Sequence, residues 1–244
     1  MTVEEAIQEL FLKIRENLNL RRFALVDGTA VSYIHGGGSV GVLVTFDTDA
    51  ADKAEFIEIG KNVAMQVAAM SPEYLSQQDI TPEELAKMRN ITIESTLNNP
   101  DTLPKPILVK VINKAIDAGM LSAEDLAAYE AEKNNKFLFN FLSKEAVAAF
   151  AQVAVADRAV YESDPIFSKA IDGRINKQIK EICLLEQAFV RSDIFEGNVG
   201  GYIANVAKAI GASIKATGFV RLAKGEGIEK KEDNFAAEIA GMVK

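Results

Sequence analysis

Few side chains in this sequence of 244 residues are suited to bond-making chemistry. It contains one histidine, His35, and one cysteine, Cys183. They supply too few ligands for a zinc or haem site, and a single cysteine excludes an internal disulfide. Cys183 lies in a largely apolar run over 181–185 and is interpreted as a small core residue rather than a reactive thiol. We therefore expect no catalytic residue, no metal and no cofactor.

The segment that follows His35 matches several functional patterns, and each fails on its context. Glycines within 36–41 have the spacing of a dinucleotide-binding loop, but the chain continues as a strand where that loop requires a helix. Ser39 fits the nucleophile position of a hydrolase elbow, but the one histidine precedes it by four residues instead of following far downstream. Three aspartates within 47–52 approximate a calcium loop but lack its glycine.

Composition and charge exclude further classes of protein. Hydrophobic residues make up 48% and charged residues 25%, which is typical of a globular protein. The net charge of −8 and the lack of a basic patch disfavour direct binding of nucleic acid. The N-terminus is acidic, without the basic region of a signal peptide, and no run of 18 apolar residues occurs. We expect a cytoplasmic protein that does not bind membranes.

Hydrophobic periodicity predicts a small sheet covered by helices. A helix over 2–19 places one apolar face toward a partner, formed by Val3, Ile7, Leu10, Phe11, Ile14 and Leu18. Two strands joined by the glycine loop form a hairpin, and a third strand follows near the C-terminus. The expected strands span 30–35, 41–46 and 213–223, and the expected covering helices span 51–70 and 198–210.

Residues 81–180 have the pattern of a helical module. Thr81-Pro82 and Asp164-Pro165 are strong helix starts, and residues 98–163 carry further starts with few strand signals. The predicted fold class is α+β, with a three-stranded antiparallel sheet covered by helices and an expanded all-helical, coiled-coil-like insertion. The predicted domains are an N-terminal helix (1–22), an α+β core (23–80 and 181–231), the helical insertion (81–180) and a C-terminal helix (232–244).

Five blocks, read in order, resemble the bacterial elongation factor Ts family. The first is Lys-Ile-Arg-Glu-Asn-Leu-Asn-Leu-Arg-Arg over 13–22, and the second is the histidine hairpin over 33–44. The third, over 63–75, resembles the family's I-A-M-x-[IV]-A-A and P-x-[YF]-[LIV] motifs, and the fourth, over 181–190, its E-x-x-L-L-x-Q-x-F-V. The fifth comprises the closing strand and C-terminal helix over 218–240.

The resemblance implies that the protein is not an enzyme but a guanine-nucleotide exchange factor that binds elongation factor Tu with GDP and promotes GDP release. It implies a partner-binding set, namely Ile14, Arg15, His35, Gly36, Val190 and Phe235. From the residues alone, Ile14 is equally a core residue and Val190 equally a strand residue.

Three departures from the family pattern bear on this expectation. The family's N-terminal three-helix module and its Thr-Asp-Phe-Val segment do not occur in these residues, Arg15 stands where glycine is common, and residues 98–163 exceed the expected helical hairpin. We therefore expect a truncated core with reduced activity, the alternative being a non-catalytic interaction scaffold of the same fold. The apolar face of the helix over 2–19 is expected to fold back on the rest of the chain or to pair with a second copy in a homodimer.

Overall fold

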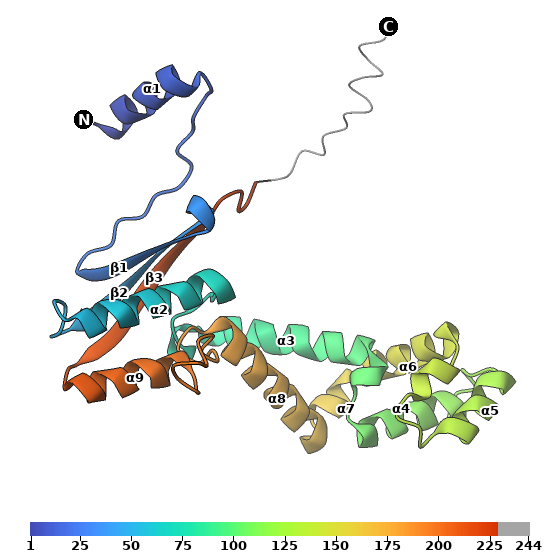
Figure 1. Ribbon diagram of the computed structural model, residues 1–244. Coiled ribbons are helices and arrows are strands. Elements are labelled where there is room, and N and C mark those ends of the chain that lie inside the picture. The colour runs from blue at the N-terminus through green and yellow to red at the C-terminus, as the bar shows by residue number, and fades with distance from the viewer. Residues whose placement is uncertain (229–244) are drawn as a thin grey trace, which may run out of the picture. The chain divides into compact units, whose positions relative to one another are not determined.

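The computed structural model describes residues 1–228 and divides the chain into two compact units (Figure 1). The first unit comprises Met1–Ala69 and the described part of Ile203–Lys244, and the second comprises Met70–Tyr202. The predicted C-terminal helix over 232–244, including Phe235, lies outside the described residues.

The described residues form an α+β fold, as predicted. The strands are β1 (Thr29–His35), β2 (Val40–Thr48) and β3 (Ile214–Ala223). The helices are α1 (Val3–Ile14), α2 (Ala54–Met70), α3 (Pro82–Asn98), α4 (Lys105–Asp117), α5 (Ala123–Glu132), α6 (Lys144–Ala156), α7 (Arg158–Glu162), α8 (Pro165–Ile182) and α9 (Val199–Ile210). Short 3₁₀ turns lie at Gly36–Gly38, Gln77–Asp79, Pro100–Thr102 and Leu138–Phe141.

The three strands form one antiparallel sheet in the order β1-β2-β3, which confirms the predicted hairpin and third strand. In the central strand β2, side chains alternate between the two faces, and Val42, Val44 and Phe46 are buried. Val44 lies between Val31 on β1 and Phe219 on β3. One face of the sheet therefore carries an apolar row that requires a cover.

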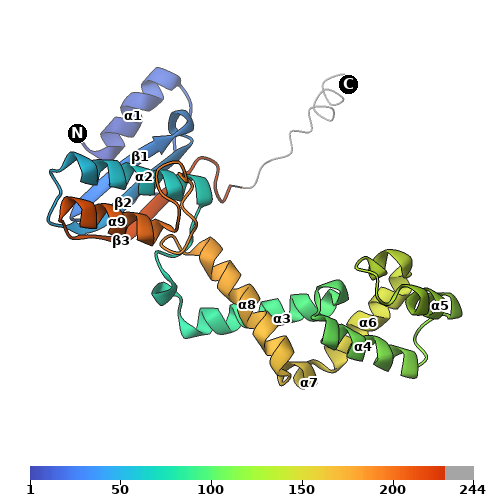
Figure 2. The same cartoon turned by 60° about the horizontal axis from the view of Figure 1, so that its bottom comes forward.

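Helices α2 and α9 lie along one side of the sheet, as predicted (Figures 1 and 2). Phe56 on α2 meets Phe46 on β2 edge to face, with ring centroids 5.3 Å apart. The Lys53 ammonium donates a hydrogen bond to the carbonyl of Ile210 at 3.2 Å, which joins the start of α2 to the end of α9. The two helices thus close the apolar face of β2.

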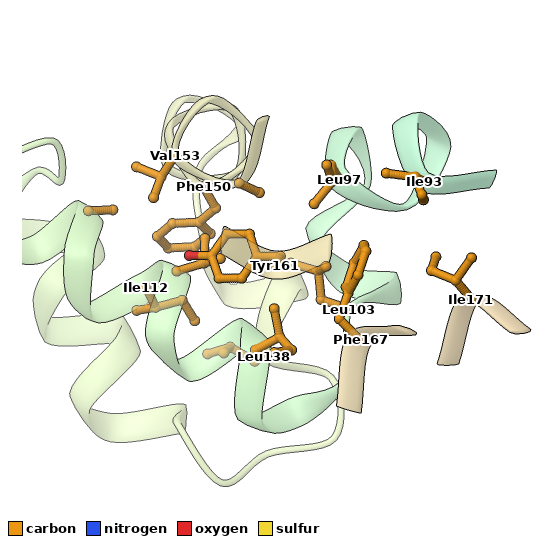
Figure 3. Packing of buried hydrophobic residues seen from close by; sticks show 14 of the residues in the cluster. Ile93, Leu97, Leu103, Ile112, Leu138, Phe150, Val153, Tyr161, Phe167 and Ile171 are labelled. Carbon is orange, nitrogen blue, oxygen red and sulfur yellow. The ribbon is translucent and has the colours of Figure 1, made fainter. Parts of the chain in front are cut away.

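The second unit is built around an apolar core of its own (Figure 3). Residues 98–163 contain helices and 3₁₀ turns and no strand, so the prediction of an all-helical stretch is confirmed. The core includes Ile93, Leu97, Leu103, Ile112, Leu138, Phe150, Val153, Tyr161, Phe167 and Ile171. These side chains come from α3, α4, α6, α7, α8, the turn at Leu138–Phe141 and, for Leu103, the residues just before α4, so the helices are held by one shared core.

Two helix starts in this unit share one buried carboxylate. Ser122 caps α5 and Ser143 caps α6, and each also donates its hydroxyl to Asp125, at 2.6 Å and 2.9 Å respectively. The Ser143 backbone amide donates to the same side chain at 2.8 Å. The hydrogen bonds from Ser122 and Ser143 hold the pKa of Asp125 below its ordinary value. The carboxylate therefore ties the starts of α5 and α6 together.

Two predicted helix boundaries were wrong. The first helix ends at Ile14 rather than at residue 19, because Arg15 takes the left-handed conformation with φ 60° and ψ 29°. Leu18 consequently lies in residues 15–28, which form neither helix nor strand. Helix α2 begins at Ala54 rather than at residue 51, because the Lys53 amide closes a turn onto the Ala50 carbonyl at 3.0 Å.

The helical glycine at position 60 allows α2 to approach the sheet closely. A methyl group at Gly60 would lie 2.4 to 2.9 Å from the side-chain carbons of Val31 on β1. A methyl group at Gly173 on α8 would meet no described heavy atom within 4 Å. A methyl group is therefore hindered by packing at Gly60 and unhindered at Gly173, so the two helical glycines can be compared directly.

We predict opposite effects of Gly60→Ala and Gly173→Ala on the free energy of unfolding. Gly60→Ala should destabilise the protein by about 1–3 kcal/mol, because the methyl group overpacks the contact with Val31. Gly173→Ala should stabilise it by roughly 0.5–1 kcal/mol, because alanine loses less backbone freedom in a helix. Urea unfolding of both variants measures the difference, and equal shifts would contradict the proposed close approach at Gly60.

Candidate partner-binding site

The described residues hold no group of three or more His, Cys, Asp or Glu side chains able to bind a metal ion. None of their helices is long and apolar enough to cross a membrane. The hairpin turn, the end of α1 and the loop that holds Val190 are the surfaces that the sequence singles out.

The turn between β1 and β2 is built on three glycines with positive φ. Their φ values are 56° at Gly36, 63° at Gly37 and 95° at Gly38. A methyl group at Gly36 would lie 2.4 Å from the Ser39 hydroxyl oxygen, which itself donates to the His35 carbonyl at 3.1 Å. Glycine at 36 therefore allows Ser39 to close the turn directly behind His35.

His35 is the last residue of β1, and its side chain is exposed. The Tyr33 hydroxyl lies 2.9 Å from Nδ1 of its imidazole, and the two ring centroids are 5.8 Å apart. Tyr33 and His35 are two residues apart, so they lie on the same face of the strand. This contact restrains the imidazole at the end of the sheet, where it is accessible to another molecule.

Ile14 and Arg15 mark the end of α1, whose residues are all at least partly exposed. Ile14 is 52% exposed, so of the two alternatives left open for it, the core residue is excluded. Leu10 and Phe11 are also exposed and continue the apolar face of the helix. The expected folding back of this face is not found in the described residues, since α1 buries none of its side chains.

Val190 belongs to the second unit and lies in a loop, so of the two alternatives left open for it, the strand residue is excluded. The preceding residue, Phe189, is buried and stacks on Tyr202 with ring centroids 4.3 Å apart. The Phe189 amide also donates to the Gly197 carbonyl at 2.9 Å. Val190 is 41% exposed and follows this fixed aromatic pair directly.

The structure thus brings some of the predicted residues together. His35 and Gly36 share the hairpin turn, and Ile14 and Arg15 share the end of α1. Sequence reasoning missed Tyr33, which the alternation of β1 could have indicated because it shares a face with His35.

Comparison with known proteins decides the family. The model of the elongation factor Ts family matches residues 1–226. The chain belongs to the elongation factor Ts family. It is 34% identical to elongation factor Ts of Clostridioides difficile over an alignment that covers 100% of this chain and 60% of that relative. It is 32% identical to elongation factor Ts of Clostridium perfringens strain SM101, with 99% of this chain and 59% of that relative aligned. It is 30% identical to elongation factor Ts of Syntrophotalea carbinolica, with 100% of this chain and 60% of that relative aligned. The chain spans about 60% of the length of these curated relatives.

The residue that ends α1 has a distinct backbone conformation. Arg15 is not a glycine, yet it adopts φ 60°. Its amide donates to the Phe11 carbonyl at 2.7 Å and closes the last turn of α1. A non-glycine residue in this conformation costs roughly 1–2 kcal/mol.

The Cys183 thiol is not accessible to reagents in solution in this member of the elongation factor Ts family. It is fully buried at the end of α8, where its amide donates to the Ile179 carbonyl at 3.0 Å. Burial raises the pKa of its thiol to about 11. The interpretation of Cys183 as a core residue is confirmed.

We predict that Cys183 does not react with thiol reagents in the native protein. At pH 8 a pKa of about 11 leaves on the order of 10⁻³ of the thiol ionised, and burial hinders access further. The rate of modification by a disulfide reagent should be at least 100-fold lower in buffer than in denaturing urea. Similar rates in the two conditions would contradict the burial of this residue.

Proposed function

We propose that the chain is a guanine-nucleotide exchange factor that binds elongation factor Tu with GDP and promotes GDP release. The match of the elongation factor Ts family model across 1–226 carries this proposal. The exposed, restrained imidazole of His35 supports it, because that side chain is available to another protein. The proposed activity makes and breaks no covalent bond, so it requires no catalytic residue.

The proposed mechanism is allosteric. Binding of this chain favours a state of elongation factor Tu in which the contacts to GDP and its magnesium ion are weakened. The free energy of the new interface offsets the nucleotide contacts that are lost. Linkage makes the effect reciprocal, so the factor by which the chain weakens GDP binding equals the factor by which GDP weakens binding of the chain.

Each part of the candidate site has a proposed role in this interface. The hairpin residues His35 and Gly36 contact the partner, as do Ile14 and Arg15 at the end of α1. Val190 supplies an apolar contact from the second unit, and Phe235 is proposed to contribute from outside the described residues. The uncovered apolar face of α1 is also the surface on which a second copy of the chain would pair.

The extent of exchange is a separate part of the proposal. The Thr-Asp-Phe-Val segment, which in the family wedges between two helices of the partner, does not occur in these 244 residues. We propose that these residues alone bind elongation factor Tu more weakly than a longer factor and accelerate GDP release less. Interface energy speeds release only to the degree that it favours the open state.

We predict a measurable but reduced exchange activity. Stopped-flow release of a fluorescent GDP from the cognate elongation factor Tu should accelerate with the concentration of the chain and reach a plateau. The plateau should lie below that of a factor that contains the Thr-Asp-Phe-Val segment, because the wedge is lacking.

Two outcomes would contradict this prediction. Saturable binding without any acceleration would identify the chain as an interaction scaffold. Acceleration equal to that of the longer factor would show that the wedge is dispensable.

We predict that His35→Ala weakens binding of elongation factor Tu without unfolding the sheet. Loss of a well-placed contact at an interface costs about 1–2 kcal/mol, which corresponds to a rise of roughly 5- to 30-fold in Kd. The melting temperature should hardly change, because the imidazole is exposed. Titrations at matched salt measure the effect, with Glu58→Ala on the exposed side of α2 as the control. Equal affinities would remove His35 from the interface.

A further inference from the structure

Glu226 lies in the turn after β3 and binds residues from the segment that precedes β1. Its carboxylate accepts from the Arg22 guanidinium at 3.1 Å and from the Arg221 guanidinium at 3.4 Å. The Arg21 guanidinium donates to the Glu226 backbone carbonyl. We call Arg21, Arg22, Arg221 and Glu226 the Glu226 clamp. It joins positions that are more than 200 residues apart in the sequence.

The clamp lies at the end of the sheet that carries His35. Ala223, the last residue of β3, pairs with Val40 on β2, and Val40 pairs with His35 on β1. The Lys224 amide, next in the chain, donates to the carbonyl of Ser39 in the hairpin turn at 2.8 Å. The turn that contains Glu226 is therefore hydrogen-bonded to the hairpin turn.

The segment that enters β1 begins at the opposite end of the sheet. Thr29, the first residue of β1, pairs with Phe46, and β1 is 7 residues long, so it separates Thr29 from His35 by roughly 20 Å. Without the clamp, α1 would be tethered to Thr29 through residues 15–28, far from the hairpin turn. With Arg21 and Arg22 held, the chain returns along the sheet to the end that carries His35.

The clamp also shortens the free tether of α1. The tether to β1 has 14 residues (15–28), whereas the tether to the clamp has only six (15–20). For a flexible chain the r.m.s. end-to-end distance grows as the square root of length, about 5–6 Å times √n, which gives roughly 21 Å against 13 Å. A shorter tether raises the effective concentration of the end of α1 near the hairpin.

We infer that Glu226 is a positioning residue, which holds the end of α1 and the His35 hairpin together as one composite partner-binding surface. This inference rests on the proposed function, because it gives a purpose to holding Ile14 and Arg15 near His35. Glu226 itself does not contact the partner in this scheme. It acts through Arg21 and Arg22, which fix the path of the chain between α1 and β1.

The electrostatics of the clamp agree with this role. The hydrogen bond from Arg22 and that from the Ala223 amide hold the pKa of Glu226 below its ordinary value, so the carboxylate is ionised at neutral pH. The side chains of Arg22 and Glu226 are 41% and 44% exposed. Such a pair is screened by salt and adds little to folding stability, so it can be removed without unfolding the sheet.

The clamp can be tested without the partner by measuring the distance between α1 and β1. Spin labels are attached to Leu12→Cys on α1 and Ile34→Cys on β1, both positions with well-exposed side chains. The buried Cys183 does not compete for the label. Distance distributions are recorded for this labelled protein, for Glu226→Gln, for the double variant Arg21→Gln/Arg22→Gln, and for Glu58→Gln as a control with the same loss of charge.

We expect the same distribution for the labelled protein and for the Glu58→Gln control, and a wider one for the clamp variants. The double arginine variant should have a distribution about 1.5-fold wider, because the r.m.s. tether length grows as the square root of 14/6. Glu226→Gln should also widen the distribution. Salt at 1 M, where the screening length is about 3 Å, should widen the distribution of the labelled protein and leave that of Glu226→Gln unchanged. If neither variant alters the distance distribution, the inference that the clamp restrains α1 is wrong.

A second measurement tests what the clamp does for binding, on unlabelled protein. Glu226→Gln should raise the Kd for elongation factor Tu severalfold, with an unchanged melting temperature, and Glu58→Gln should leave the Kd unchanged. A widened distance distribution with an unchanged Kd would overturn the positioning role. If the parent protein does not bind elongation factor Tu at all, the proposed function fails, and the distance measurement still decides whether the clamp exists.

Discussion

The packing of β2 against α2 is the interaction on which the rest of the first unit depends. Val42, Val44 and Phe46 are buried on one face of the central strand, and burial of such side chains contributes about 1.5–3 kcal/mol each. Because side chains alternate along a strand, this burial fixes the register of β2, and a slip by one residue would turn all three toward the other face. The register in turn places His35 opposite Val40 and Val40 opposite Ala223, so the hairpin turn and the turn after β3 meet. The turns of the candidate site are thus positioned by a row of buried apolar side chains.

Much of this fold could be predicted from local sequence pattern. The alternation of β2, the glycine turn and the capping residues Thr81 and Asp164 are short-range signals, and the elements that they predict are present. The errors arose where backbone conformation rather than residue type decides the outcome. Arg15 ends α1 in a conformation that residues other than glycine seldom adopt, so the apolar periodicity that continued to Leu18 gave no warning. Val190 lies in a loop directly after Phe189, which stacks on Tyr202.

The candidate site could be predicted only in part, because some of its contacts join neighbouring residues and others join residues far apart in the sequence. His35 and Gly36 are neighbours, and a positive φ at glycine in a hairpin is a local expectation that the structure confirms. The contact of Tyr33 with His35 spans two residues and follows from strand geometry. The pairing of Arg22 with Glu226 spans 204 residues and leaves no periodic signal, since charged residues in two loops look like ordinary solvated surface. Long-range ion pairs of this kind become visible only when the register of the sheet has brought the two turns together.

The second unit buries its apolar residues in a core of its own. Phe150, Phe167 and Ile171 are almost fully buried among helices of that unit, and the carboxylate of Asp125 ties two of its helix starts together. A module that satisfies its own apolar and polar groups can gain or lose helices without exposing the core of a neighbouring unit. The hairpin and the clamp depend instead on short polar contacts at the edge of a small sheet, where one carboxylate orders two distant segments. Variation in the helical unit should therefore alter what that unit contacts, whereas variation at Glu226 should alter how the chain before β1 is held.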